Sequence, residues 1–116
     1  MITFVNLLVR DDDLSHEEFC ERWLGDHTDL ASDLPGLERY VTSTPTDPSK
    51  SAYDGIVRLT FADGAAMAAA FESEVGQEVQ ADAATFADME ASETMVVEET
   101  VHVAETALPS ENSEDD

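Results

Sequence analysis

One histidine lies on the apolar side of a predicted helix. His27 follows Trp23 by four residues and Phe19 by eight, so the three side chains share one face of a helix that ends before Pro35. An imidazole held in an apolar pocket works as a general acid or base. The alternative is a packed histidine that bonds to the sheet or to a backbone carbonyl, and the spacing alone permits both interpretations.

A histidine that moves protons needs a second group to orient its ring. Asp26 and Asp29 flank His27 but point about 100° to either side of it around a helix, so we expect the partner to come from a strand. The candidates are Arg39, Tyr40, Tyr53 and Glu99. We prefer Tyr40, because a phenol can also hold a substrate carbonyl or enol, and we predict His27 and Tyr40 as the catalytic residues. Simple packing is the alternative for Tyr40.

Aromatic and methionine side chains are placed to form an apolar pocket around His27. Such walls suit a flat apolar ligand. The same stripes at helical spacing also form ordinary core, which is the alternative interpretation. The predicted ligand-binding residues are Trp23, Tyr53, Phe71, Phe86 and Met89.

The sequence contains no motif typical of a metal or nucleotide site. The three histidines are scattered, with no His-x3-His pair, and there is no glycine-rich phosphate loop. We therefore predict no metal ligands and no cofactor. Cys20 is the only cysteine, which excludes an intrachain disulfide, and we interpret it as a buried, unreactive thiol.

The elements that position these residues follow from capping signals and periodicity. Ser15 and Glu18 have the spacing of a capping box, which predicts a first helix over residues 16–34. The other predicted elements are strands at residues 2–9, 37–43, 53–61 and 94–103, and helical stretches at 64–73, capped by Asp63, and at 77–90, after a break near Gly76.

The predicted element order is β, α, β, β, α, β. This order is the split βαβ arrangement of the ferredoxin-like fold, an α+β fold whose four-stranded antiparallel sheet carries both helices on one face. The second face of the sheet is also rich in valine and leucine. Because a large exposed apolar face marks an interface, we predict a homodimer joined through this sheet face.

The length of the chain fits one domain. Its 116 residues are 42% hydrophobic and 28% charged, a globular balance, and we assign residues 1–104 to the domain and 105–116 to an acidic, disordered tail. The apolar segment at residues 1–9 is too short to span a bilayer and lacks a cleavage site, so we expect a cytoplasmic protein.

The charge balance is strongly acidic. The chain has 27 aspartates and glutamates against 5 lysines and arginines, a formal net charge of -22. This surface repels phosphate backbones and anionic lipids, so we predict neither nucleic acid nor membrane as a partner. Adaptation to high salt explains the charge, since the Debye length shrinks to roughly 3 Å at about 1 M ionic strength. We interpret the protein as halophilic, from a salt-accumulating, archaeal cytoplasm.

We expect the melting temperature to climb steeply with KCl concentration. Molar salt screens the repulsion among the surplus carboxylates, whereas dilute buffer leaves it in place. Thermal unfolding in a series of KCl concentrations measures the effect. Equal stability in dilute buffer and in molar salt would contradict the halophilic interpretation.

Two blocks of the sequence resemble the EthD family of the dimeric α/β barrel superfamily. The first is Phe19-x3-Trp23-x3-His27-x2-Leu30-x3-Leu34-Pro35-Gly36-Leu37-x2-Tyr40, and the second is Tyr53-Asp54-Gly55-Ile56 with the later run from Met95 to Val101. The resemblance extends from about Ile2 to Val103. It implies a ferredoxin-like monomer that pairs through its sheet into a dimeric α/β barrel, with a pocket between helices and sheet in each subunit.

The superfamily that the chain resembles contains several chemistries, so its fold does not specify a reaction. Our first hypothesis is a cofactor-independent enzyme acting on a small apolar carbonyl or aromatic compound, of isomerase, cyclase, dehydratase or oxygenase type, with His27 as proton carrier. The second is a non-catalytic dimer that binds a hydrophobic ligand. The third is a structural role, with the pocket filled by the protein's own side chains. Haem binding rests on the superfamily analogy alone.

Overall fold

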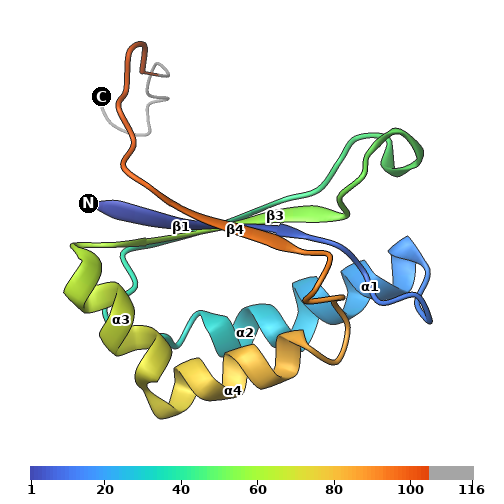
Figure 1. The fold of residues 1–116 in the computed structure, drawn as a ribbon, viewed down its shortest axis with the longest axis horizontal. Helices are drawn as coiled ribbons and strands as arrows, with labels where there is room; N and C mark the ends of the chain where they lie inside the picture. The colour runs from blue at the N-terminus through green and yellow to red at the C-terminus, as the bar shows by residue number, and fades with distance from the viewer. Residues whose placement is uncertain (105–116) are drawn as a thin grey trace, which may run out of the picture.

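The computed structural model describes residues 1–104, which form two layers: a four-stranded antiparallel sheet and helices packed against one of its faces (Figure 1). The elements are β1 (Ile2–Leu8), α1 (His16–Arg22), the π-helical turn η1 (Trp23–His27), α2 (Thr28–Ala31), β2 (Arg39–Ser43), the 3-10 turn η2 (Pro48–Lys50), β3 (Gly55–Phe61), α3 (Gly64–Glu72), α4 (Glu74–Ala83) and β4 (Glu93–Val97). The predicted tail at 105–116 lies outside the described residues.

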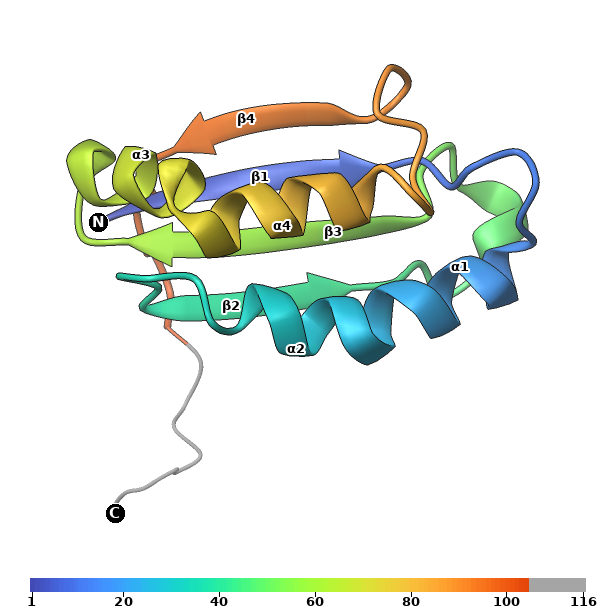
Figure 2. The same ribbon diagram turned by 90° about the horizontal axis from the view of Figure 1, so that it is seen from below.

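The strand order confirms the ferredoxin-like prediction. The sheet runs β2-β3-β1-β4, and every neighbouring pair is antiparallel. The two edge strands are therefore β2 and β4, with β1 and β3 in the centre (Figure 2). Side chains alternate between the two faces of a strand. In β1, Phe4, Asn6 and Leu8 belong to the side that faces the helices, where they line a cavity.

The helix starts are capped as the sequence predicts. The Ser15 hydroxyl accepts a hydrogen bond from the Glu18 backbone N–H at 3.1 Å, and the Glu18 carboxylate accepts one from the Ser15 N–H at 2.9 Å. Asp63 accepts a bond from the Ala66 N–H at 2.8 Å. These bonds satisfy backbone donors that have no partner within the helix.

Two predicted elements end earlier than expected. The strand predicted at 94–103 stops at Val97, because its only neighbour, β1, begins at Ile2 and offers no backbone beyond that point. The helix predicted at 77–90 is α4, which begins at Glu74 and ends at Ala83. The break that precedes α4 falls at Ser73, whose hydroxyl accepts a hydrogen bond from the Gly76 N–H at 3.0 Å.

The first helix contains an irregular π turn. Gly25 has φ −96° and ψ −114°, outside the helical region, within η1. The Thr28 hydroxyl donates a hydrogen bond to the carbonyl of Trp23 at 2.8 Å, so this carbonyl keeps a partner. Trp23 and His27 both lie in this turn, and both are buried.

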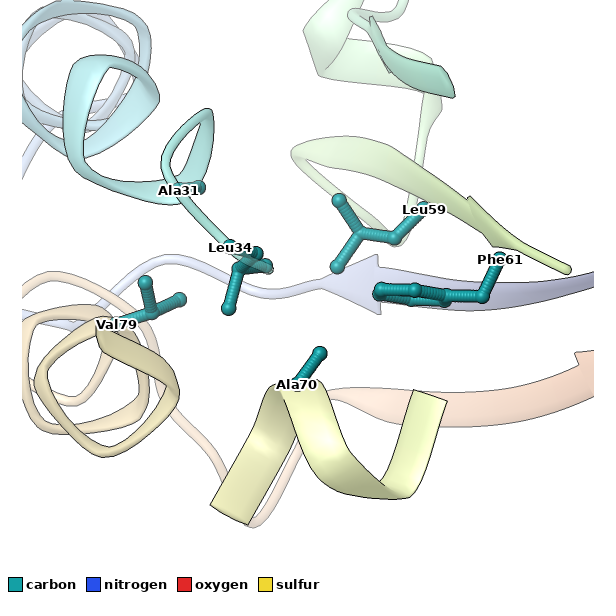
Figure 3. Packing of buried hydrophobic residues seen from close by; sticks show 6 residues of the cluster. All are labelled: Ala31, Leu34, Leu59, Phe61, Ala70 and Val79. Carbon is teal, nitrogen blue, oxygen red and sulfur yellow. The ribbon is translucent and has the colours of Figure 1, made fainter. Parts of the chain in front are cut away.

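Two apolar clusters hold the helices on the sheet. The first contains Ala31, Leu34, Leu59, Phe61, Ala70 and Val79, whose side chains meet between the layers (Figure 3). The second contains Leu8, Phe19, Trp23, Phe86 and Ala87. Burial of one of the larger apolar side chains stabilises the folded state by about 1.5–3 kcal/mol. The two clusters therefore supply most of the driving force that holds the helices on the sheet.

The face of the sheet that points away from the helices carries many apolar side chains. By register and alternation these are Val5, Leu7, Val41, Ile56, Met95 and Val97, and Arg58 and Glu93 lie among them. Met95 is 64% exposed, and the helices α1, α2, α3 and α4 all lie on the opposite side (Figure 1). None of the helices found in residues 1–104 has the length and apolar character needed to cross a membrane.

Candidate functional site

A cavity of about 300 Å³ lies between the sheet and the helices. Its floor comes from all four strands, and its walls come from η1, α2, α3, α4 and the turn that follows α4. Met89 in that turn and Thr94 on the edge strand β4 are exposed lining residues, which places an opening toward β4. In Figure 2, β4 lies beyond α4, at the side of the sheet away from α1 and α2.

His27 lies in the wall of this cavity and is only 7% exposed. Its Nδ1 lies 2.8 Å from Oδ2 of Asp82. The edge of one ring meets the face of the other between His27 and Phe86, with the ring centres 4.9 Å apart and the planes at 77°. The imidazole is thus held by an ionic hydrogen bond on one side and by aromatic packing on another.

The Asp82 contact decides which nitrogen of His27 is free for chemistry. A carboxylate accepts a hydrogen bond and does not donate one when ionised, so Nδ1 carries the proton. Nε2 then carries the lone pair of the neutral ring. Nε2 forms no hydrogen bond with the described residues, and it is not among their enclosed, unpartnered polar atoms. The arrangement leaves Nε2 as the free proton acceptor of a residue that lines the cavity.

The prediction that a strand supplies the orienting partner was wrong, since Asp82 belongs to α4. Asp82 lies three residues after Val79 and four before Phe86, so an acidic residue interrupts the apolar stripe of that helix. This interruption is the feature of the sequence that could have pointed to Asp82 as the partner of His27. Of the residues predicted as partners of His27, Glu99 has its Oε2 at 3.6 Å from Nη1 of Arg58, and Arg39 is exposed.

Tyr40, Phe71, Phe86 and Met89 line the cavity together with His27. Burial raises the pKa of the Tyr40 phenol, and the nearby Thr28 hydroxyl offsets part of this rise. Because the ordinary pKa of a phenol is about 10, Tyr40 stays a neutral hydrogen-bond donor at physiological pH. Its side chain is therefore suited to hold a ligand oxygen.

We expect Tyr40 to titrate above the ordinary phenol pKa of about 10. The raised pKa has a defined effect on stability. The Tyr40 phenol loses its proton at a lower pH in the unfolded chain than in the folded chain. Its contribution to the free energy of unfolding is therefore complete below pH 10 and is lost as the pH rises through the folded pKa. A phenolate absorbance titration of a Tyr53→Phe variant, which retains Tyr40 alone, measures it. A midpoint at or below 10 would contradict the burial argument.

Trp23 and Tyr53 are placed outside the cavity, although the sequence pattern predicts them there. Trp23 is fully buried, and its ring lies so close to Gly55 that a Cβ at that glycine would be 2.3 Å from Cη2. Tyr53 lines a separate shallow groove with Leu7 and Ile56.

Asn6, Gln80 and Thr94 are polar lining residues that the sequence interpretation missed. Asn6 is the polar member of the Phe4, Asn6, Leu8 alternation in β1, which is the signal that points to it. Its Oδ1 is enclosed and has no hydrogen-bond partner among residues 1–104. One acceptor of this lining residue is therefore left without a partner in the described part of the chain.

Cys20 lies away from the cavity, in a small polar cluster. Its Sγ is 3.4 Å from Nε2 of His16, and Nδ1 of His16 is 2.9 Å from Oδ1 of Asp54. Burial, and secondly the negative charge of Asp54, raise the pKa of the Cys20 thiol. The thiol form therefore dominates at neutral pH, which agrees with the expectation of an unreactive cysteine. The expectation that it is buried was wrong, since Cys20 is partly exposed.

Comparison with known proteins yields a family and a set of similar folds. The EthD domain model matches residues 11–90. An EthD family protein from Bacillus halodurans has a similar structure, with a TM-score of 0.73 and 20% sequence identity, over 86% of this chain and 100% of that one. No curated protein matches the chain.

Two further solved structures show the same fold. SnoaB, a cofactor-independent oxygenase from Streptomyces nogalater, is 15% identical over 91% of this chain and 97% of its own, with a TM-score of 0.65. A dimeric ferredoxin-like protein of unknown function from Thermobifida fusca is 16% identical over 83% of this chain and 86% of its own, with a TM-score of 0.64. At these identities the likeness establishes the fold alone.

Proposed function

Since this chain belongs to the EthD family, we propose that it is a cofactor-independent enzyme acting on a small apolar carbonyl or aromatic compound, with His27 as proton carrier. The observation that carries this proposal is the position of His27 in the wall of an apolar cavity, with Nδ1 bound to Asp82 and Nε2 without a partner among the described residues. An oriented base within reach of a bound substrate is the arrangement that general acid–base catalysis requires.

In the proposed reaction, Nε2 of His27 takes a proton from the substrate and later returns it. The ring becomes positively charged in between, and the Asp82 carboxylate 2.8 Å from Nδ1 stabilises that charge. Tyr40, kept neutral by its raised pKa, donates a hydrogen bond to a substrate oxygen. Phe71, Phe86 and Met89 supply apolar contacts to a flat ligand.

The structural relatives are compatible with this proposal. SnoaB is a cofactor-independent oxygenase, so the fold can host chemistry without a cofactor. One fold hosts many reactions, and isomerase, cyclase, dehydratase and oxygenase types are each compatible with a proton transfer by His27. The proposal therefore specifies the proton carrier and the apolar character of the substrate, and leaves the reaction type to experiment.

We also propose that the protein works as a homodimer in a cytoplasm of high salt. The apolar outer face of the sheet, which includes the 64% exposed Met95, supports pairing through that face into a dimeric α/β barrel. Similar proteins from other organisms are dimeric. The net charge of -22 supports adaptation to salt. Sedimentation equilibrium in molar KCl tests the dimer, and a monomer across the concentration series would contradict it.

Ligand capture tests the proposed function. The purified chain is exposed to extract from its source cells, and captured compounds are identified by mass spectrometry before and after incubation at working temperature. Ala83 lines the cavity, and Ala84, the next residue, is exposed outside it. Ala83→Phe is expected to abolish capture by filling the cavity, and Ala84→Phe to retain it.

The outcomes separate the alternatives. Conversion of a captured compound into a product by the wild-type chain supports an enzyme. A compound that is captured through the cavity and returned unchanged supports the non-catalytic ligand-binding dimer. Equal capture by wild type and Ala83→Phe would show that the cavity is not the binding site, and would contradict both.

A further inference from the structure

A short C-terminal arm projects from the outer face of the sheet. We define the arm as residues 98–104, the described segment that follows β4. Figure 1 shows it rising on the side of the sheet opposite the helices. Oε2 of Glu99 lies 3.6 Å from Nη1 of Arg58, a contact that ties the start of the arm to the sheet. Beyond this contact, Val101 is 73% exposed and Val103 is 91% exposed.

The arm keeps the sequence pattern of a strand with one apolar side. Val97, Val101 and Val103 occupy positions of the same parity, so an extended arm places them along one side. A single exposed valine needs no explanation, but an apolar side on a segment that leaves its sheet needs a surface to cover it. The neighbouring strand β1 does not supply that surface, because its pairing with β4 ends where Thr3 meets Val97.

A groove that suits such side chains lies on the same face, at the other end of the sheet. It has a volume of about 160 Å³, and its apolar walls are Leu7, Pro45, Tyr53 and Ile56. We call it the Tyr53 groove. A water molecule takes up about 30 Å³ of liquid, so the groove has room for an aliphatic side chain. The loop between β2 and β3, which forms one wall, rises on the same side of the sheet as the arm (Figure 1).

The arm of the same chain does not fill the Tyr53 groove. The arm begins beyond the pairing of Val97 with Thr3, whereas the groove is at Leu7, four residues further along β1. At about 3.4 Å per residue, this separation is roughly 14 Å. The high exposure of Val101 and Val103 means that residues 1–104 of their own chain leave them largely uncovered. A second copy of the chain carries the same groove.

We propose that the arm of one protomer places Val101 and Val103 in the Tyr53 groove of a second copy of this chain. This inference rests on the homodimer of the proposed function and names the contact that locks it. A two-fold axis parallel to the sheets and perpendicular to their strands brings the arm end of each protomer over the loop end of the other. The same contact then fills both grooves and closes the assembly at two protomers.

Charge favours this orientation over the other two-fold arrangement. An axis parallel to the strands would set the two arms side by side, so that Glu98 and Glu99 of one arm face the same residues of the other. These like charges repel each other in a chain that already carries a net charge of -22. In the loop beside the Tyr53 groove, Nζ of Lys50 lies 3.8 Å from Oδ2 of Asp47 and balances its charge. The acidic arm is therefore repelled less by this loop than by a second arm.

The first test measures the strength of the dimer by sedimentation equilibrium of the full chain in molar KCl. Val103→Asp is expected to raise the Kd of the dimer by about tenfold or more, because a carboxylate has to leave water to enter the apolar groove. Val96→Asp is the matched control, since Val96 is 52% exposed but pairs with Phe4 and so belongs to the helix side of β4. It is expected to leave the Kd unchanged. Thermal unfolding checks that both variants fold.

The second test locates the arm by disulfide trapping. Every chain carries Cys20→Ser, which removes the only cysteine. Thr44 is an exposed residue of the Tyr53 groove. A mixture of Thr44→Cys chains and Val103→Cys chains is expected to form a two-chain disulfide on mild oxidation, because the two positions come within bonding distance. A mixture of Thr44→Cys chains and Val96→Cys chains, the matched control, is expected to form none.

The outcomes separate the arm contact from the dimer itself. A wild-type dimer whose Kd is unchanged in Val103→Asp overturns the arm contact and leaves the proposed homodimer intact. A disulfide between two Val103→Cys chains places the arms side by side and also overturns it. A disulfide within one chain that carries both Thr44→Cys and Val103→Cys places the arm in its own groove, with the same consequence. A wild-type chain that stays monomeric contradicts the proposed homodimer, and the arm contact fails with it.

Discussion

A His27→Ala variant is expected to convert the cavity ligand about 10²–10⁴-fold more slowly than the wild-type chain while still binding it. The imidazole is the cavity group with an oriented, unpartnered nitrogen, so its loss removes the proton acceptor. The apolar walls that hold the ligand remain. Single-turnover conversion and ligand titration, measured on the same preparation, separate the two effects.

Two further variants test whether this loss is specific. His102 is exposed, so His102→Ala is expected to convert ligand at the wild-type rate. Asp82→Asn is expected to lose less than His27→Ala, because the Asp82 side chain is 40% exposed and solvent screens its charge. Conversion by His27→Ala at the wild-type rate, with His102→Ala slower, would show that the site has been assigned to the wrong histidine.

Gly76→Ala is expected to destabilise the fold more than any other single methyl addition at a described glycine. A Cβ at Gly76 would lie 2.2 Å from the carbonyl oxygen of Ala70 and 2.6 Å from that of Phe71. Both obstructing atoms are backbone, so α3 and α4 would have to separate. Such overpacking costs about 1–3 kcal/mol or more, which lowers the melting temperature by roughly 10 °C in a domain of this size.

Gly64→Ala is the matched control, since both glycines lie in the first turn of a helix. The nearest atom to a Cβ at Gly64 is Ile2 Cδ1 at 4.0 Å, an ordinary contact. Alanine is the better helix former, so this variant is expected to be as stable as wild type or slightly more stable. Equal melting temperatures for Gly76→Ala and Gly64→Ala would show that α3 and α4 do not approach as closely as the structure has them.

The fold was predictable because its signals are local. The capping box at Ser15 and Glu18, the Asp63 cap and the alternation in β1 each act within a few residues of the chain. The order of elements then leaves few ways to arrange a sheet with two helical connections. The lengths of the strands and helices were less predictable. For example, β4 ends where its neighbour β1 has no further residues to pair with.

The site was only half predictable. His27, Tyr40, Phe71, Phe86 and Met89 do line one cavity, as helical and strand spacing indicate. Trp23 does not, because it is fully buried against Gly55, a contact between distant segments that helical spacing cannot anticipate. The partner of His27 was also missed, since the hydrogen bond to Asp82 spans 55 positions in the chain.

The sequence by itself determined the order of elements, the strongly negative charge and the presence of one histidine on an apolar helix face, because capping, periodicity and composition are properties of neighbouring residues. The tertiary structure alone decided what that histidine meets. Only the packing of α4 beside η1 brings Asp82 to Nδ1, and only the sheet register places Asn6 among the residues that line the cavity. Contacts between distant segments depend on how whole elements pack, and that information is distributed over the chain.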